Sequence, residues 1–315
     1  MVLSIIIVNW NVRDLLRKCL ASIGTQMLLG SDEYETIVID NASTDGSVEM
    51  LRGEFPGIAV IESKVNLGFG AGCNKALHLA KGEFVLLLNP DTELIDHAVD
   101  GMLEIMRERR RAAIVAARLV NAELTFQSAS GGALPTLANV AWNYLFLRYF
   151  LPRSLAPSPL FLDGDSRELM RIEWVSGAAM LLRREAIGER IFDESFFMFG
   201  EDLDLCDRMG RAGWEVLYSG RHSVLHHQGK SFEQQGSLEL RASAHDGPRS
   251  VFKRDRGALS VLAYDAILFA GFLVRWPLYG FLSRVRPGRG YAARCEFSRK
   301  YVRAMLHRRP SHPVT

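Results

Sequence analysis

Residues 3–24 read LSIIIVNWNVRDLLRKCLASIG, and they contain two successive periodicities that recur along the chain. The run from Leu3 to Val8 is short and apolar at nearly every position, which is typical of a strand buried on both faces of a parallel sheet. After Asn9 the apolar residues recur three and four positions apart, as on one face of a helix; they are Leu15, Leu16, Cys19, Leu20 and Ile23. The stretch therefore predicts a buried strand that leads directly into an amphipathic helix.

This strand-then-helix pattern repeats through the first hundred residues. Further short apolar runs lie at 36–39, 58–61 and 84–88, and helical spacing follows at 48–51 and 71–80. Strands that alternate with helices predict an α/β fold with a doubly wound, mostly parallel sheet. Ligands of such sheets bind at the carboxyl ends of the strands. Polar residues gather at those ends here, in the segments 9–11, 40–41 and 89–91.

The composition excludes several classes of protein. The chain has 315 residues, of which 48% are hydrophobic and 23% charged, so wholesale disorder is excluded. Its four cysteines stand far apart without a CxxC pair, which argues against a zinc ribbon or a disulfide framework and fits a reducing compartment. The opening MVLSIII lacks a basic segment, so we expect no signal peptide.

The second half of the chain is less regular. The pattern predicts a helix over 94–111 and a strand over 112–116. An irregular stretch follows over 121–171, and its apolar part 137–151 is compatible with a helix. Further on, the pattern predicts a strand over 172–182, a helix over 203–211 and strands over 216–218 and 224–226. We expect one domain over residues 1–240, with one half over about 1–117 and a second half over about 118–240.

Basic charge is concentrated near the C-terminus. Between Arg249 and Arg309 there are 14 Lys and Arg against three acidic residues, although the formal net charge of the whole chain is +2. This asymmetry indicates either a basic segment that faces an anionic surface or a solvated helical face. We expect residues 248–315 to form a helical C-terminal extension.

An apolar segment, 258–274, lies within this extension and is interrupted by Asp265. It is short for a membrane span, and a carboxylate at mid-depth would be costly. We expect an interfacial amphipathic helix with basic flanks. A helix packed on the core of the protein and a true span are the alternatives.

Two of the polar loops suit a nucleotide. Asp40 and Asn41 end a predicted strand, where a carboxylate can accept hydrogen bonds from a ribose hydroxyl or a base N–H. Ser43 or Asp45 could cap the helix that follows. The segment NLGFGAGCN, residues 66–74, brings three glycines to a strand-to-helix turn, where phosphate is well received. Its spacing departs from the dinucleotide fingerprint, so it is weak as an indication of NAD.

Carboxylates and histidines supply three further candidates. Asp91 follows a buried strand and is either a ligand for a cation that bridges phosphates or a turn or helix cap. The segment FFMFGEDLDLCDR, residues 196–208, carries four carboxylates; a helix N-terminus and an i,i+4 pair explain some of them, and a carboxylate held against the apolar lead-in could act as a general base. His226 and His227 precede Lys230 and Ser231, which favours a metal-and-phosphate site over a core position.

Together these segments resemble the family-2 glycosyltransferases of the GT-A fold, especially their rhamnosyltransferase-like branch. The matching segments cover residues 1 to about 235 in the expected order. They are IVNWN at 7–11, VIDNASTDGS at 38–47, NLGFGAGCN at 66–74, NPDT at 89–92, WVSGAAMLLRREAI at 174–187, FDESFFMFGEDLDLCDR at 192–208 and HHQGKS at 226–231. The resemblance implies a nucleotide-sugar half over about 1–117 and an acceptor half over about 118–240.

The resemblance implies roles for individual residues. Asp91 holds the last position of the family's DxD motif and, with His226, would bind a divalent metal, Mg²⁺ or Mn²⁺, on the donor diphosphate. Asp202, beside Glu201, would be the base that deprotonates the acceptor hydroxyl. The nucleotide-sugar would be held by Asn9, Asn11, Asp40, Asn41, Asp45, Asn66, Gly68 and Asn89. Asn89 stands where a strict DxD motif has its first carboxylate, which lowers the charge of the expected metal site.

The expected activity is therefore the inverting, metal-dependent transfer of a sugar, with rhamnose one candidate, from a nucleoside-diphosphate donor to a lipid-linked or polysaccharide acceptor. We expect the protein to act in the cytoplasm on the inner face of the plasma membrane, with an anionic membrane surface as a partner and no nucleic acid. A catalytically inactive sugar-nucleotide-binding or scaffold protein and a Rossmann-type oxidoreductase are the alternatives.

Overall fold

The computed structural model describes residues 1–162, 164–227, 247–254, 256–287 and 290–307, which form two compact units. The first unit comprises residues 1–134 and 161–251, and the second comprises residues 135–160 and 252–315. Each unit is described by itself below. The predicted domain boundary near residue 240 lies outside the described residues, and the division into domains 1–240 and 248–315 stays a prediction.

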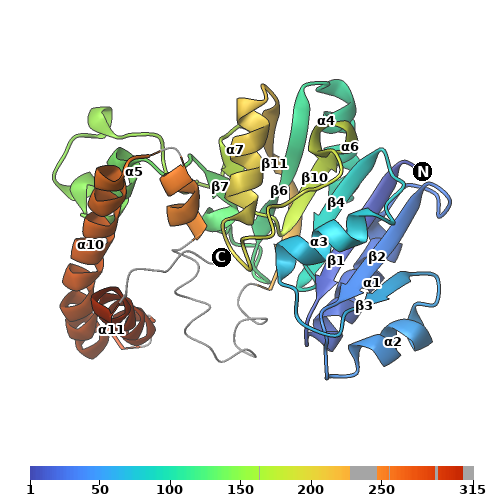
Figure 1. Ribbon diagram of the computed structural model, residues 1–315, viewed down its shortest axis with the longest axis horizontal. Coiled ribbons are helices and arrows are strands. Elements are labelled where there is room, and N and C mark those ends of the chain that lie inside the picture. The colour runs from blue at the N-terminus through green and yellow to red at the C-terminus, as the bar shows by residue number, and fades with distance from the viewer. Residues whose placement is uncertain (163, 228–246, 255, 288–289, 308–315) are drawn as a thin grey trace. The chain divides into compact units, whose positions relative to one another are not determined.

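The first unit is built on a nine-stranded mixed sheet (Figure 1). Its strands are β1 (Leu3–Asn9), β2 (Tyr34–Asp40), β3 (Ala59–Glu62), β4 (Phe84–Leu88), β5 (Thr92–Leu94), β6 (Ala112–Val120), β8 (Leu169–Arg171), β10 (Ala179–Arg183) and β11 (Glu215–His226). They lie in the order β3-β2-β1-β4-β10-β6-β11-β5, and β8 pairs with β11. The pairs β3-β2, β2-β1, β1-β4 and β6-β11 are parallel, whereas β10 is antiparallel to both of its neighbours. The prediction of a doubly wound, mostly parallel α/β sheet is confirmed.

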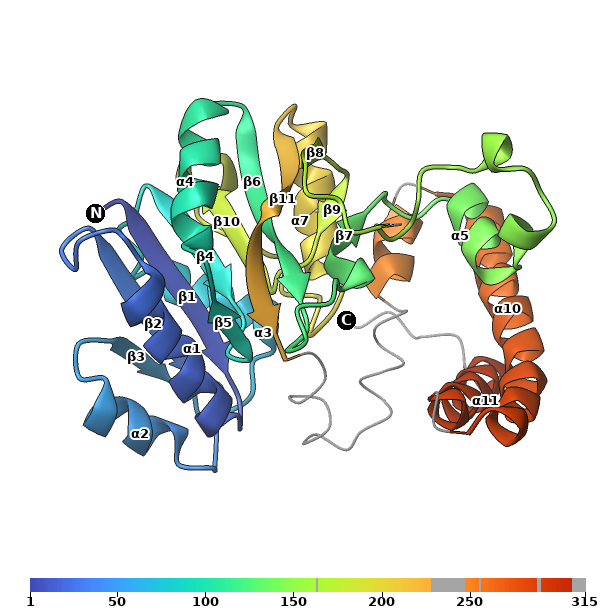
Figure 2. The ribbon, with the colours of Figure 1, turned by 180° about the vertical axis from the view of Figure 1, so that it is seen from behind.

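Helices cover both faces of this sheet. Figure 1 shows α3 and α7 in front of it, and Figure 2, from behind, shows α1 and α4. The helices of this unit are α1 (Arg13–Gln26), α2 (Ser47–Glu54), α3 (Phe69–Leu77), α4 (Ala98–Glu108), α6 (Arg184–Ile187) and α7 (Glu201–Arg211). A separate two-stranded sheet joins β7 (Gly131–Gly132) to β9 (Trp174–Val175).

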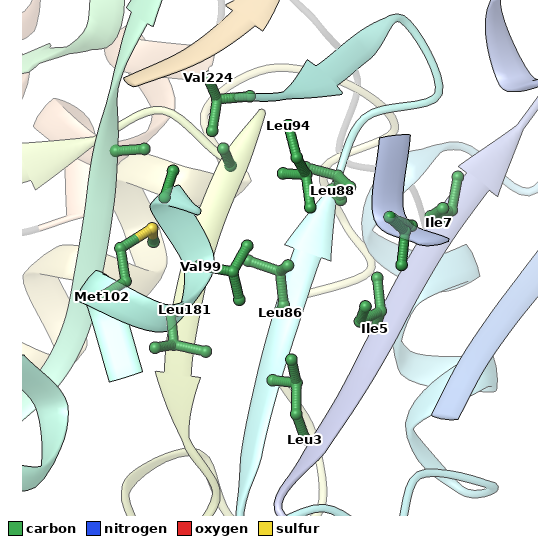
Figure 3. Close-up of a cluster of buried hydrophobic side chains, with 14 of the residues drawn as sticks. Leu3, Ile5, Ile7, Leu86, Leu88, Leu94, Val99, Met102, Leu181 and Val224 are labelled. Carbon is green, nitrogen blue, oxygen red and sulfur yellow. The ribbon is translucent and has the colours of Figure 1, made fainter. Parts of the chain in front are cut away.

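The alternation of side chains along β1 explains why helices are needed on both sides. Leu3, Ile5 and Ile7 belong to one buried cluster with residues of α1 and α4, shown in Figure 3, whereas Ile6 and Val8 belong to a second cluster with residues of α3 and α7. Successive side chains of a strand point to opposite faces, so a strand that is apolar throughout requires cover on both. The sequence expectation for this strand is confirmed.

Three elements differ from the sequence expectation. The apolar run 172–182 is not one strand but two, β9 and β10, separated by a turn at residues 176–178. The helix expected from residue 94 begins at Ala98, because Thr92–Leu94 form β5 and Asp96 and His97 adopt positive φ of 50°. Residues 215–226, expected as two strands, form the single strand β11, which shifts register between Ser219 and Ser223.

The second unit is helical. It contains α5 (Leu137–Tyr144), α10 (Ala258–Val285) and α11 (Tyr291–His307), packed around a small core of aromatic and aliphatic side chains. Gly271 of α10 lies against α5, where a Cβ would come within 2.7 Å of the carbonyl oxygen of Tyr144. Arg275 donates to the carbonyl oxygen of Asn143 (2.9 Å), so it satisfies an orphan group at the end of α5. Of the segment 137–151, only the first half is α-helix.

Helix α10 continues to Val285, through Pro277 and well past the predicted end at Val274. By length and composition alone it is one helix that could cross a membrane, although helices of soluble cores pass the same criterion. It buries one stripe of side chains, which includes Val261, Tyr264 and Leu268.

Candidate functional site

The carboxyl ends of β1 and β2 meet in a buried hydrogen-bond network. Asn9 Nδ2 donates to Asp40 Oδ1 (2.8 Å) and to Ser43 Oγ (3.1 Å), and Asp40 Oδ2 accepts from the backbone N–H of Ser43 (2.8 Å). Asn9 and Asp40 are almost inaccessible, and Asn9 Oδ1 has no hydrogen-bond partner among the residues that the structure describes. The structure therefore brings together two of the predicted nucleotide-binding residues.

Asn11, Asn41 and Asp45 extend this network into the adjoining loops. Asn11 Oδ1 accepts from the backbone N–H of Thr44 (2.7 Å), and Asn41 Nδ2 donates to the carbonyl oxygen of Gly68 (3.0 Å). One oxygen of Asp45 accepts from the N–H of Arg13 (2.7 Å) and the other from that of Ser47 (3.1 Å), at the starts of α1 and α2. Asp45 thus shapes this loop, and a direct contact from it to a nucleotide stays a prediction.

The glycine-rich turn 66–74 packs closely against the loop that leads into α7. Asn66 Oδ1 accepts from the N–H of Gly68 (2.9 Å), and Gly68 has a φ of +82°. A Cβ on Gly68 would lie 2.2 Å from the carbonyl oxygen of Phe197, so only glycine fits. Asn74, which the sequence analysis missed as an individual residue, contacts the same loop: it accepts from the N–H groups of Ile191 and Phe192 (both 3.0 Å).

The start of β5, just after β4 in the chain, lies beside the end of β11. Residues Thr92 and His226 are paired in the antiparallel ladder of β5 and β11, and the N–H of His227 donates to the carbonyl oxygen of Asp91 (2.8 Å). This pairing brings His226 Nε2 to 3.4 Å from Asp91 Oδ1, with both side chains largely buried. The two residues predicted as metal ligands are therefore adjacent. The rest of that motif, from Gln228 to Ser231, lies outside the described residues.

This pair fits a divalent cation that also binds phosphate. His226 Nδ1 lies 3.0 Å from Gln127 Oε1, which leaves Nε2 on the side of Asp91. The described residues contain no cluster of three or more His, Cys, Asp or Glu that could bind a metal by itself. Magnesium sites commonly use one or two protein ligands and complete their coordination with substrate phosphates and water. Asp91 and His226 could be those protein ligands.

The four acidic residues of α7 divide into two kinds. Asp204 accepts from Arg208 Nε (2.9 Å) and Asp207 pairs with Arg211 (2.9 Å), both one helical turn apart. The side chain of Asp204 in this pair is completely buried. Among the described residues, Glu201 and Asp202 form no ion pair, although they begin the helix.

Asp202 is held by backbone N–H groups. Its Oδ1 accepts from Leu203 (2.9 Å) and its Oδ2 from Gly177 (3.4 Å). Burial raises the pKa of Asp202, although these N–H groups oppose the shift. Burial, and secondarily the charge of Asp202, raise the pKa of Glu201 to about 8, and Glu201 Oε2 is buried without a hydrogen-bond partner in the described part of the chain. At neutral pH the pair therefore favours one negative charge over two.

The turn at residues 176–178 contacts both Asn89, in the NPDT segment, and Asp202, at the start of α7. The carbonyl oxygen of Ala178 accepts from the N–H of Asn89 (2.9 Å), and the N–H of Gly177 donates to Asp202. Asp202 is thereby anchored at Gly177, one residue before Ala178, which contacts the NPDT segment that contains Asp91. A long apolar strand would not provide this turn, so the break between β9 and β10 is part of the site.

Comparison with known proteins agrees with this geometry. The family model for glycosyl transferase family 2 matches residues 4–187. The N-acetylglucosaminyl-diphospho-decaprenol L-rhamnosyltransferase of Mycobacterium tuberculosis is 27% identical over 267 residues, which are 81% of this chain and 85% of that protein. The rhamnosyltransferase WbbL of Escherichia coli is 23% identical over 241 residues, 72% of this chain and 85% of that protein.

The solved structures support the fold. The mannosyltransferase PcManGT from Pyrobaculum calidifontis, in complex with GDP-Man and Mn²⁺, superposes with a TM-score of 0.60 at 15% identity, covering 96% of this chain and 85% of that one. The predicted GT-A architecture is confirmed. The alternative of an oxidoreductase is wrong, because the family model for glycosyl transferase family 2 matches residues 4–187. Because the family model matches more than half of the sequence, the chain belongs to glycosyl transferase family 2, and it resembles the rhamnosyltransferases of that family.

Proposed function

We propose that the protein is an inverting, metal-dependent glycosyltransferase that moves a sugar from a nucleoside-diphosphate donor to a hydroxyl of a lipid-linked or polysaccharide acceptor. The observation that carries the proposal is the backbone link between Asn89 and Asp202 through residues 177–178. This link holds Asp202 close to the segment that contains Asp91. Asp202 has no cationic partner among the described residues.

The relatives favour a sugar nucleotide and a lipid-linked acceptor. The mycobacterial relative is named for transfer of L-rhamnose to N-acetylglucosaminyl-diphospho-decaprenol, and the Pyrobaculum mannosyltransferase was solved with GDP-Man and Mn²⁺. We propose a sugar nucleotide of this kind as the donor, with rhamnose as the first sugar to test. The acceptor would be a lipid-linked glycan.

In the proposed mechanism, Asn9, Asp40 and Asn41 hold the nucleoside at the ends of β1 and β2. Asp91 and His226 would hold a divalent cation at the diphosphate. When bound, that cation would offset the negative charge that develops on the departing nucleoside diphosphate. Asp202 takes the proton of the acceptor hydroxyl, whose oxygen attacks the anomeric carbon opposite the leaving group and so inverts its configuration. The raised pKa of Asp202 makes it a better base than an exposed aspartate.

We further propose that the second unit attaches the protein to the inner face of the plasma membrane. On α10 the side chains of Leu259, Leu262 and Phe281 are 83%, 65% and 61% exposed. At 100° per residue these positions lie opposite the stripe that α10 buries. Exposed apolar surface of this extent is typical of an interaction site, and the surplus of Lys and Arg after residue 249 favours an anionic lipid surface.

The activity is tested by offering the purified protein a panel of nucleoside-diphosphate sugars with Mn²⁺ or Mg²⁺, and by following release of the nucleoside diphosphate. The proposal expects release from at least one donor, acceleration by a glycosyl lipid acceptor and loss with a chelator. The anomeric configuration of the product, read by NMR, should be opposite to that of the donor. Retention of configuration would contradict the assignment of Asp202 as a base, and chelator-resistant turnover would contradict the metal.

A further inference from the structure

Gln127 lies in the loop after β6 and is in contact with both the backbone and the ring of His226. It is only 5% exposed. Its Nε2 donates to the carbonyl oxygen of His226 (2.8 Å) and to Asn121 Oδ1 (2.8 Å), and its Oε1 lies 3.0 Å from His226 Nδ1. Its own backbone N–H donates to the carbonyl oxygen of Leu119 (3.0 Å), which ties the loop to the sheet.

These contacts determine which atom of His226 carries the proton. A backbone carbonyl oxygen can only accept, so the amide atom of Gln127 that faces the carbonyl of His226 must be the nitrogen. The other amide atom, which faces His226 Nδ1, is then the oxygen, and Nδ1 must donate to it. In the neutral ring Nε2 therefore carries the lone pair, and Nε2 is the atom that lies 3.4 Å from Asp91 Oδ1.

The pairing of β11 with its two neighbouring strands explains why Gln127 lies beside His226. The end of β11 pairs with β6 on one side, with Leu225 opposite Val120, and with β5 on the other, with His226 opposite Thr92. The end of β11 therefore has Asp91 near one edge and the loop after β6 near the other edge. Metal-binding histidines generally donate their second ring N–H to a fixed acceptor, which sets the tautomer and the ring orientation.

We infer that Gln127 is a positioning residue that holds His226 in its Nδ1–H tautomer, so that the Nε2 lone pair and Asp91 face the same divalent cation. This inference rests on the proposed function. It concerns residues of this chain alone, and it can be tested without a sugar donor or an acceptor.

The test compares the full chain with Gln127→Leu, which keeps approximately the size of the side chain but cannot accept or donate, and with Gln127→Glu. Both variants lose the hydrogen bonds that Nε2 donates to His226 and Asn121, and Gln127→Glu alone keeps the acceptor for Nδ1–H, so their difference reports on that acceptor. Gln26→Leu at the end of α1 is the matched control. The first readout is Mn²⁺ affinity in the presence of a nucleoside diphosphate, from the EPR signal of free Mn²⁺. Gln127→Leu should bind Mn²⁺ about 10–100-fold more weakly. Gln127→Glu should recover most of the affinity, and Gln26→Leu should match the wild type.

The second readout is the tautomer itself, taken from ¹⁵N-histidine NMR spectra of the metal-free protein, with the signals of His226 assigned by their loss in His226→Asn. In the wild type and in Gln127→Glu, Nδ1 should carry the proton, and in Gln127→Leu the two tautomers should mix. A wild-type protein with the proton on Nε2 would overturn the inference, as would Gln127→Leu with wild-type Mn²⁺ affinity. A correct tautomer in a wild-type protein that binds no Mn²⁺ would instead contradict the metal role in the proposed function.

Discussion

The backbone N–H of Gly177 donates to Oδ2 of Asp202 (3.4 Å), so a turn between two strands orients a carboxylate at the start of a helix. Asp202 also accepts from the N–H of Leu203 and has no cationic partner within the described residues. Asp204 and Asp207 on the same helix are each paired with an arginine. One helix thus presents acids in two different environments.

Asp202→Asn should keep the shape of the site and remove the proton acceptor. Turnover should fall about 10²–10⁴-fold, the usual contribution of a general base, with little change in donor affinity. The measurement is the initial rate of nucleoside diphosphate release at saturating acceptor. Asp207→Asn is the matched control on the same helix and should retain most of the activity. A near-normal rate in Asp202→Asn would transfer the role to Glu201 or another group.

Glu201→Gln should change how stability depends on pH. The pKa of Glu201 in the folded protein, about 8, is above its ordinary value of 4.5, so folding takes up a proton between these two pH values. The wild type therefore loses stability as the pH rises through this window, and the variant, which has no proton to lose there, does not.

The melting temperature of Glu201→Gln relative to the wild type should consequently increase from pH 5 to pH 9, with about 2–4 °C for each kcal/mol of difference. In the control Glu123→Gln, at an exposed loop position, the plot of melting temperature against pH should stay parallel to that of the wild type. Parallel curves for Glu201→Gln as well would show that Glu201 is ionised at neutral pH.

Gly68→Ala should destabilise the first unit, because the φ of +82° and the carbonyl oxygen of Phe197 leave no room for a Cβ. We expect a loss of about 1–3 kcal/mol in the free energy of unfolding by urea, together with weaker nucleotide binding. Gly53→Ala is the control, since a Cβ there meets nothing within 4 Å and a helix interior favours alanine over glycine. Equal stability of Gly68→Ala and the wild type would mean that the turn adopts another conformation.

The double variant Leu262→Ser/Phe281→Ser should weaken membrane attachment. The full chain should sediment with vesicles of anionic lipid, less with neutral lipid and less as salt is raised, because each basic residue near such a surface contributes about 1 kcal/mol. The double variant should remain largely in the supernatant, whereas Leu79→Ser, at an exposed leucine of the first unit, should sediment like the wild type. Attachment that resists salt entirely would favour a spanning helix, and no attachment of the full chain would contradict the proposal.

The sequence predicted those parts of the site that lie at the ends of uniformly apolar strands. Asn9 and Asp40 are the last residues of β1 and β2, Asp91 follows shortly after β4, and parallel strands bring their carboxyl ends to one edge of the sheet. The turn at 176–178 escaped prediction because apolar residues continue on both sides of it. Gln127 escaped because it lies in an irregular loop outside the recognised motifs, and only the pairing of β6 with β11 brings it to His226.

The central claim is that Asp91 and His226 bind a divalent cation on the donor diphosphate, and calorimetric titration of a nucleoside diphosphate with and without Mn²⁺ tests it most directly. The wild type should bind the nucleotide substantially more tightly with Mn²⁺. Asp91→Asn should lose this enhancement, while its nucleotide affinity without metal stays the same or rises. Glu93→Gln, two residues further on in β5, should retain the enhancement. An Asp91→Asn variant with the full Mn²⁺ enhancement would contradict the claim.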